Sequence, residues 1–490
     1  MKKRKFNMFL NIATLCLCVC AIAFGVYSAK NASLNVSGTV GFTAHNVKAK
    51  IEGFITNYAD SADGAIVTTD TQITADGGLA LNGADTSASF NLGATKGTGT
   101  ATRYFSDLGS SGNPEDIIVK IKITNTSDFD ILVNVDMANC KATTGLENII
   151  KVDCDKSAVV IAKNNNATFT FNIKLLPNSD GSYGSAGLTT PTSNNIQLKM
   201  NLEKSAYTQS QVKTDAIAIK KFTTAEISAI NGGLQTSNTS YADLYPYYVE
   251  MGEVNNKKIK WLVVGTFVND SVVALEDSDK TALSQGLLLN KTYVMVSEKA
   301  LEAISFQNKF TNSGEYLNDY GYAAQDYATS NIRNYLKGAD VFLSAKSSSG
   351  SYIPDGTSVN LLTTYNLTSN PLYTKIQART LASLYNESAS GGIKEMKTVP
   401  TSKAGKKAVD STPDKLWLLS QTETNIIFPS DDNKKAAEIG YTYSDFWWLR
   451  SSSSSKANMV RRVENYGFLS DCSVEQYLAP RNSTRPAFLF

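Results

Sequence analysis

Apolar and polar residues alternate along much of the chain between residues 34 and 202. In residues 119–124, Val and Ile alternate with Lys and Thr, a period of two that is typical of a strand with one buried and one exposed face. Similar runs occur at residues 34–43, 47–52, 131–137, 168–175 and 196–202. Turn-forming residues separate them, so we predict an antiparallel β-sandwich, jelly-roll or Ig-like, over residues 30–203.

The pattern changes after a polar segment at residues 204–240, which we interpret as a linker. Residues 259–264, apolar except for Lys260, and residues 293–296 predict buried strands, and the capping residues Ser297, Ser330 and Ser420 each predict that a helix follows. The first would include Leu301 and Ile304, and a further helix is predicted at residues 376–385. Strands and helices together predict an α+β domain over residues 241–490.

The N-terminus predicts export. A basic stretch at residues 2–5 precedes an apolar run at residues 8–27, as in a secretory signal. Cleavage near Ser28 or Ala29 and retention as a membrane anchor both remain open, since the run is long enough to span a bilayer. Residues 1–29 are therefore a signal peptide or anchor, the only expected membrane contact, and the rest is expected outside the cytoplasm or at the cell surface.

Length and charge narrow the classes of function. A chain of 490 residues exceeds what one hydrophobic core usually organises, which indicates more than one domain. Lys and Arg number 47 against 45 Asp and Glu, so no strong field attracts nucleic acid, and none is expected as a partner.

The cysteines leave one pairing open. Cys140 and Cys154 have a spacing that would close a loop of about 15 residues, a cross-link that contributes about 3 kcal/mol in the chain-entropy model. The alternative is two buried free thiols. Cys472 has no partner in its own half of the chain.

The sequence contains few residues that could form a catalytic site. The single histidine, His45, argues against Ser-His-Asp, Cys-His and histidine-ligated zinc sites. Nothing in the spacing pairs Glu423, Asp445 and Glu464 as acid and base. We therefore expect no catalytic residue, no metal and no cofactor.

An aromatic segment near the C-terminus carries the most distinctive pattern. Residues 446–449 are apolar on both faces, as in a central strand. A structural role is therefore expected for five large side chains: Trp261, Trp447, Trp448, Arg450 and Arg485. The segment 464–482 is instead rich in Tyr and Asn, which favour recognition, and predicts ligand contacts from Asn465, Tyr466, Tyr477 and Asn482.

Two resemblances extend these expectations. Residues 34–42, 123–127 and 168–175 resemble the exported biofilm-matrix and camelysin-like proteins of Gram-positive bacteria. That resemblance implies a jelly-roll-like sandwich whose N-terminal strand, here residues 31–44, could be lent to a neighbouring copy. An ordinary first strand is the alternative.

The second resemblance covers about residues 245–490. Residues 259–264, 330–336, 417–420, 448–452 and 485–488 resemble a domain-of-unknown-function family of exported Gram-positive proteins. The family is similar to the C-type-lectin-like fold of formylglycine-generating enzymes, which implies that first and last strands pair and intervening loops display a ligand surface. We expect an exported cell-surface or matrix-associated adhesion protein that binds a protein or glycan, without catalysis. The alternative is a structural subunit of an extracellular fibre or biofilm matrix assembled by strand exchange.

Overall fold

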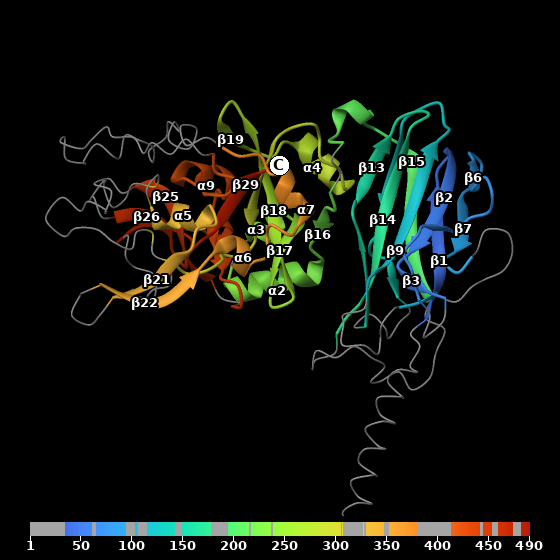
Figure 1. The fold of residues 1–490 in the computed structure, drawn as a ribbon. Helices are drawn as coiled ribbons and strands as arrows, with labels where there is room; N and C mark the ends of the chain where they lie inside the picture. The colour runs from blue at the N-terminus through green and yellow to red at the C-terminus, as the bar shows by residue number, and fades with distance from the viewer. Residues whose placement is uncertain are drawn as a thin grey trace, which may run out of the picture. The chain divides into compact units, whose positions relative to one another are not determined.

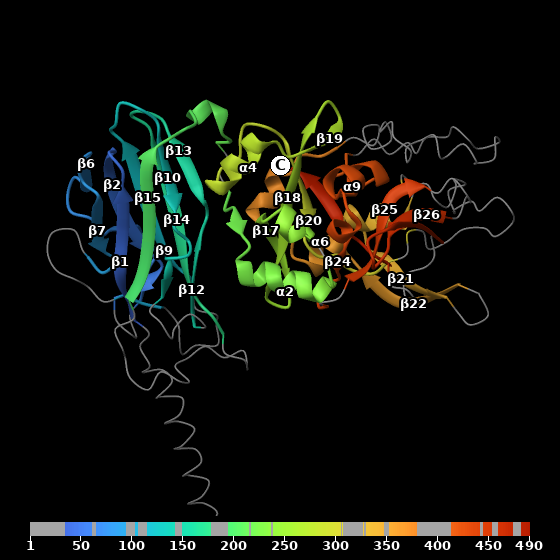
Figure 2. The same cartoon turned by 180° about the vertical axis from the view of Figure 1, so that it is seen from behind.

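The computed structural model describes residues 35–60, 65–94, 103–105, 115–142, 149–177, 195–214, 217–236, 239–304, 306, 327, 330–346, 352–379, 413–441, 444–452, 459–473 and 482–490. Figures 1 and 2 show the chain from opposite sides. It divides into two compact units: unit 1 is Met1–Ala218 with Gln285–Leu289, and unit 2 is Ile219–Ser284 with Asn290–Phe490. The division falls within the polar segment at residues 204–240.

Unit 1 contains two sheets. The first has the strand order β13-β10-β15-β1-β8-β3-β4, with β11 paired to β15 and β7 paired to β1. Its strands are β1 (Asn35–Ala44), β3 (Tyr58–Ala59), β4 (Ile66–Val67), β7 (Ser87–Asn91), β8 (Arg103–Tyr104), β10 (Ile131–Val135), β11 (Lys141–Ala142), β13 (Ala158–Ile161) and β15 (Asn195–Lys204). All its pairings are antiparallel except that of β1 with β15, which is parallel.

The second sheet is antiparallel and has the order β12-β14-β9-β2-β5, with β6 paired to β2. Its strands are β2 (Lys48–Thr56), β5 (Thr71–Gln72), β6 (Leu79–Asn82), β9 (Ile117–Asn125), β12 (Ile150–Cys154) and β14 (Asn166–Leu175). The short 3-10 helix η1 (Gln209–Gln211) follows β15.

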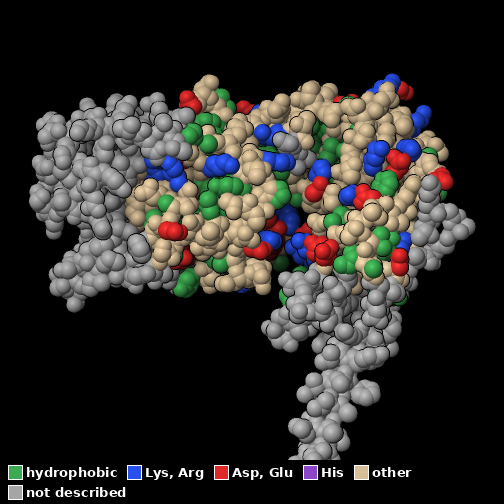
Figure 3. Space-filling view, in the orientation of Figure 1, with side chains coloured by type: hydrophobic (Ala, Val, Ile, Leu, Met, Phe, Trp, Pro, Cys, Tyr) green, Lys and Arg blue, Asp and Glu red, His purple; other side chains and the backbone are tan. Residues whose placement is uncertain are grey.

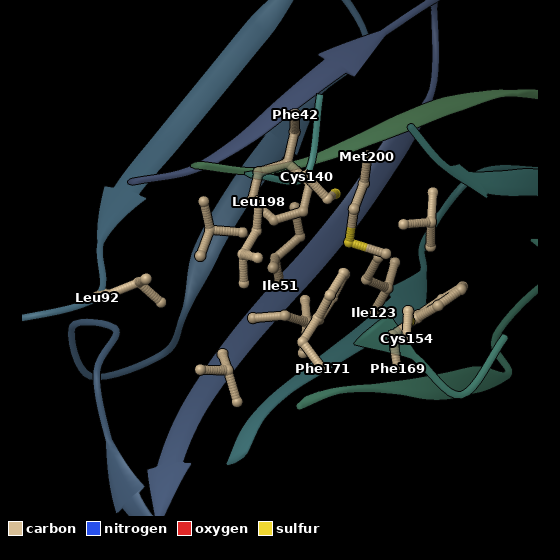
Figure 4. Packing of buried hydrophobic residues seen from close by; sticks show 14 of the residues in the cluster. Phe42, Ile51, Leu92, Ile123, Cys140, Cys154, Phe169, Phe171, Leu198 and Met200 are labelled. Atoms are coloured by element: carbon tan, nitrogen blue, oxygen red, sulfur yellow. The ribbon is translucent and has the colours of Figure 1, made fainter. Parts of the chain in front are cut away.

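The two sheets of unit 1 share one apolar core. Along β9, buried and half-buried residues alternate without a break, as the period of two predicted. Figure 4 shows side chains from both sheets meeting, among them Phe42 of β1, Leu198 of β15, Ile51 of β2 and Phe171 of β14. The predicted β-rich, multidomain architecture is confirmed, and this unit is a sandwich of two sheets.

The disulfide considered for unit 1 is absent. Cys140 and Cys154 are both buried free thiols in the shared core. Cys140 lies against the first sheet, where its Sγ accepts the N–H of Lys199 at 3.2 Å, whereas Cys154 ends β12 of the second sheet. Burial raises the pKa of Cys140 to about 11 and also raises the pKa of Cys154, so both thiols stay protonated and inert at neutral pH.

Unit 2 is built on a sheet with the order β16-β17-β18-β20-β29-β23, with β19 paired to β18. Its strands are β16 (Lys220–Lys221), β17 (Tyr247–Val254), β18 (Lys257–Val268), β19 (Ser271–Ala274), β20 (Tyr293–Ser297), β23 (Trp417–Leu418) and β29 (Pro486–Leu489). The C-terminal strand β29 lies between β20 and β23. Residues on both faces of β20 and β29 are buried, which explains their unbroken apolar sequences.

A second sheet of unit 2 has the order β24-β25-β26-β27, with β28 paired to β25. Its strands are β24 (Ala436–Ala437), β25 (Ser444–Ser452), β26 (Met459–Val463), β27 (Leu469–Ser473) and β28 (Asn482–Ser483); β21 (Val341–Lys346) and β22 (Tyr352–Val359) pair as a separate hairpin. The helices of this unit are α2 (Thr224–Leu234), α3 (Tyr241–Leu244), α4 (Asp277–Ser284), α5 (Asn331–Leu336), α6 (Leu361–Thr364), α7 (Pro371–Lys375), α9 (Gln421–Ile427) and α10 (Asp431–Lys434).

Capping residues placed two of these helices correctly. The Ser330 hydroxyl accepts the Arg333 N–H at 3.1 Å and starts α5. Ser420 and Glu423 form the reciprocal capping box of α9, with hydrogen bonds of 3.1 and 2.8 Å. Both predictions are confirmed.

The helix predicted after Ser297 is wrong, and the one predicted at residues 376–385 is not helical over its described part, residues 376–379; residues 380–385 lie outside the described residues. After Ser297 the chain stays extended, because the N–H groups of Leu301 and Ile304 donate to the carbonyls of Thr484 and Asn482 instead of to their own turn. The described part of the second, residues 376–379, also pairs with distant strands: Gln377 bridges Leu489, and Arg379 bridges Asp414. Tertiary pairing overrides local helical spacing at both places.

Within the described residues, none of the helices combines the length and apolar character needed to cross a bilayer. The apolar run at residues 8–27, on which the export prediction rests, lies outside them.

Candidate functional site

The hairpin of β26 and β27 carries the most exposed aromatic side chains in the described part of the chain. Five residues, 464–468, connect the strands: the Glu464 N–H donates to the Phe468 carbonyl at 2.9 Å, and the Gly467 N–H donates to the Glu464 carbonyl at 2.8 Å. Gly467 has a φ of 93°, a left-handed conformation that favours glycine. Glu464 and Phe468 close the loop, so its three central residues are 465–467, a three-residue hairpin loop with glycine at the last position.

Two aromatic rings project beside this glycine. Tyr466 is 66% exposed and Phe468 is 45% exposed. Their rings are parallel within 8°, and their centroids lie 6.2 Å apart, which is an offset-stacked arrangement. We call Tyr466 and Phe468 the ring pair.

The hairpin tip rests on the start of α10. A Cβ atom added to Gly467 would lie only 1.9 Å from the Asp431 carbonyl oxygen. No side chain fits in that space, so glycine is required for the backbone of the tip to approach the helix. The backbone of the tip therefore packs directly against the first turn of α10.

Arg462 holds the strands of the hairpin together. Its guanidinium donates to the Ser470 hydroxyl at 3.2 Å, the Asn482 side-chain oxygen at 3.0 Å and the Glu464 carboxylate at 3.1 Å. It also lies 4.4 Å from the centroid of the Phe446 ring. These contacts link β25, β26, β27 and β28, so the ring pair stands on a cross-braced sheet.

The structure places the predicted contact residues differently. Tyr466 is exposed and Asn465 is half-buried, both at the tip. Asn482 is completely buried, which corrects its predicted surface position: β28 pairs with β25, and the Asn482 amide accepts from Arg462 inside the sheet. Tyr477 lies outside the described residues.

Sequence reasoning missed Phe468. The signal was present, because Tyr466 and Phe468 flank a glycine with the i, i+2 spacing that puts two strand residues on one face. A Gly-containing turn between two alternating segments would have indicated the hairpin.

The three tryptophans assigned a structural role are all buried. Each indole N–H donates to a carbonyl from another part of unit 2: Trp261 to Met251 at 2.9 Å, Trp447 to Lys434 at 3.1 Å, and Trp448 to Ile304 at 2.7 Å. The indoles fill the core and satisfy their one donor there.

Arg485 is enclosed by aromatic rings. Its guanidinium lies 4.6 Å from the ring of Phe428, 5.1 Å from that of Trp447 and 5.2 Å from that of Tyr241. It donates to the Ser297 carbonyl at 3.1 Å. Burial lowers the pKa of Arg485 to about 10, the electrostatic cost of placing this cation in the core.

A second arginine cluster surrounds Glu423. Its carboxylate accepts from Arg379 at 2.7 Å and from Arg450, which also donates to the Leu418 carbonyl at 2.7 Å. Nearby, Arg333 and Asp414 form a bidentate pair with two bonds of 2.8 Å. These ion pairs are almost fully buried.

The carboxylates considered for acid and base roles are thus engaged elsewhere. Glu423 is held by two arginines and Glu464 by Arg462, while the Asp445 carboxylate accepts the Phe446 N–H at 2.8 Å. Within the described ranges, no three His, Cys, Asp or Glu residues gather as metal ligands would. His45 is exposed just after β1.

The visible surface shows no field of one sign. In Figure 3, basic and acidic side chains both occur among uncharged surface, as the near balance of 47 and 45 charges suggests. The site is therefore defined by its aromatic rings.

The arrangement of unit 2 can be compared with known families. Residues 285–490 match a family described as a domain of unknown function, DUF6273. The match includes the ring pair, Trp447, Trp448 and Arg485. It leaves out β16 to β19, although these strands belong to the same sheet as β20 and β29. No curated protein matches the chain.

Proposed function

We propose that this protein is an exported, cell-surface or matrix-associated binding and adhesion protein that recognises an extracellular glycan or protein, without catalysis. The observation that carries the proposal is the exposed ring pair, Tyr466 and Phe468, on a hairpin tip that Arg462 and Gly467 hold in place. Exposed aromatic anchors on a rigid support are the usual source of binding energy in recognition sites.

The lectin-like part of the proposal rests on the resemblance of residues 245–490. That resemblance implied direct pairing of the first and last strands, but β18 and β20 lie between β17 and β29 in the sheet they share. The hairpin with the ring pair lies between β17 and β29 in the chain. The assignment is a fold-level analogy and assigns no ligand by itself.

The test is binding of the full chain to arrays of glycans and extracellular proteins. The variant carrying Tyr466→Ala and Phe468→Ala should lose the signals that the unchanged chain gives. Val268→Ala in β18 is the matched control, because Val268 is also an exposed apolar residue of unit 2. Equal signals from the double variant, or flat signals on both arrays, would contradict the proposal.

The position of β1 supports the second candidate, a fibre or matrix subunit assembled by strand exchange. β1 is the first described strand and lies inside its sheet, parallel to β15 over Ser37 to Ala44 and antiparallel to β7. β1 also pairs with β8, and a copy of β1 from a neighbouring chain would meet the same three partners. Deleting residues 30–44 should change the oligomer size in size-exclusion chromatography and negative-stain images; unchanged oligomers would end this proposal.

A further inference from the structure

We infer that the ring pair binds the flat face of a β-linked, gluco-configured sugar chain rather than a protein surface. This inference rests on the proposed function and specifies its ligand.

The first argument is area. An aromatic side chain offers about 150–250 Å², so at 66% and 45% exposure the ring pair presents roughly 200 Å². A stable protein–protein interface buries about 800 Å² on each partner. The ring pair is far smaller than this and is comparable in size to one or two sugar rings.

The second argument is isolation. Among the described residues, the other large exposed apolar side chains are Leu244, Val268, Val273 and Ile426. They belong to α3, β18, β19 and α9, and none belongs to the sheet that carries the ring pair. Within the described part of that sheet, the rings are therefore not the centre of a wider apolar surface, as the core of a protein interface would be.

The third argument is orientation. The two rings are parallel within 8°, so a ligand face that lies flush on one ring is also parallel to the other. A gluco-configured sugar has equatorial hydroxyls, which leaves axial C–H groups on its faces to meet the electron-rich ring faces. A β-1,4-linked chain keeps successive units in a flat ribbon, whereas an α-1,4-linked chain curves away.

The surroundings of the rings suit hydroxyl groups. Arg462 and Ser470 lie opposite each other in the register of β26 and β27, on the face of the hairpin that also carries Phe468. Asn465 and Glu464 flank the tip and contribute amide and carboxylate groups. A few polar groups beside aromatic surface are typical of small-ligand sites.

The experiment titrates the full chain with cellohexaose and, separately, with maltohexaose, following aromatic NMR signals and heat of binding. Cellohexaose should bind with ring-proton shifts at Tyr466 and Phe468, and maltohexaose several-fold more weakly. Tyr466→Ala and Phe468→Ala should each weaken cellohexaose binding several-fold to about tenfold. Val273→Ala, an exposed residue of β19, should leave it unchanged.

Two further variants protect the test against misfolding. Tyr466→Phe keeps both rings and should bind cellohexaose almost normally, while Phe468→Leu keeps apolar bulk without a ring and should bind weakly. Tryptophan fluorescence during thermal unfolding reports whether unit 2 is intact.

The outcomes separate the inference from the proposed function. Equal binding of both sugars, or no shift with either, overturns the inference. If ring-dependent binding then appears only on the protein array, the proposed function survives with a different ligand class. Array binding that ignores the ring pair overturns the proposed function itself.

Discussion

The two units bury different chemistry. In unit 1 the core cluster consists of apolar side chains, and ion pairs such as Lys120–Asp70 and Lys122–Glu52 lie partly exposed. In unit 2 the pairs Arg333–Asp414 and Arg379–Glu423 are almost fully buried, and Arg485 lies among aromatic rings. Both units bury arginine, but unit 1 buries Arg103 over the Tyr58 ring with a largely exposed partner, Asp60, whereas unit 2 buries both members of its ion pairs.

This difference determines what each core tolerates. An apolar core accepts many side chains of suitable volume. A buried ion pair adds little net stability, because desolvation offsets the attraction, but removing one partner is costly. Unit 2 should therefore respond more sharply than unit 1 to changes in single charges.

The largest expected effect is from Asp414→Ala. It removes the carboxylate that holds the buried Arg333 guanidinium through two bonds of 2.8 Å. The free energy of unfolding of unit 2 should fall by about 3–5 kcal/mol. All four tryptophans, Trp261, Trp417, Trp447 and Trp448, lie in unit 2, so fluorescence in denaturant measures this loss directly.

The matched control is Asp70→Ala in unit 1, which removes the exposed carboxylate paired with Lys120 at 2.9 Å. Its cost should be below about 1 kcal/mol. Unfolding of unit 1 can be followed by labelling of its buried thiols, Cys140 and Cys154, identified by mass spectrometry. Similar losses for the two variants would remove the proposed difference between the cores.

The next largest difference is expected at alkaline pH, where the stability of unit 2 should fall more than that of unit 1. In unit 2, burial raises the pKa of seven tyrosines above the ordinary value of 10.0: Tyr241, Tyr245, Tyr248, Tyr327, Tyr335, Tyr365 and Tyr373. Each stays protonated in the folded state at a pH where the unfolded chain has lost the proton. Their stabilisation is complete below pH 10 and is lost as the pH rises further.

In unit 1 the groups with a raised pKa in the alkaline range are the thiols of Cys140 and Cys154. The stability that protonated Cys140 contributes is lost as the pH rises from its ordinary pKa of 9.0 to about 11. Above pH 10 the fluorescence midpoint of unit 2 should therefore fall more steeply than the thiol-labelling midpoint of unit 1. Parallel slopes would mean that the buried tyrosines titrate normally.

The same contrast explains what the sequence could predict. Alternation identified β9 and β14 because each strand needs only an apolar partner, and local caps at Ser330 and Ser420 identified α5 and α9. The segment after Ser297 could not be identified, since its backbone partners lie near residue 484. Long-range pairing of this kind leaves no local signal.

The candidate site was also predicted only as far as local sequence allowed. The segment with Asn465 and Tyr466 was identified from composition, but Asn482 looked equally suitable. Its burial depends on Arg462, twenty positions earlier in the chain, which uses the amide as a hydrogen-bond acceptor. A polar side chain shows its role only when its partner is known.

Gly467→Ala should have a smaller effect on stability but a clear one on binding. A left-handed backbone costs about 1–2 kcal/mol with a side chain, and the new Cβ would also meet the Asp431 carbonyl at 1.9 Å. The tip must move off α10, so array signals that depend on the ring pair should weaken.

Gly440→Ala is the matched control, because Gly440 has a similar φ of 91° but no neighbouring atom within 4 Å of its Cβ position. It should share the backbone cost and keep binding. If both variants bind equally, the seating of the tip on α10 plays no part in recognition.

The smallest effect is expected from Ile121→Val in the core of unit 1. Ile121 is fully buried in β9, and losing one methylene should cost about 1 kcal/mol. The free energy of unfolding of unit 1, followed by thiol labelling, should fall by this amount, while the fluorescence midpoint of unit 2 stays unchanged. The control is Lys122→Ala, at the next position of β9 on its outer face. It should change the free energy of unfolding of either unit by less than about 0.5 kcal/mol. An equal shift of both midpoints with Ile121→Val would show that the two cores unfold together, and the contrast between them would then describe their composition but not separate stabilities.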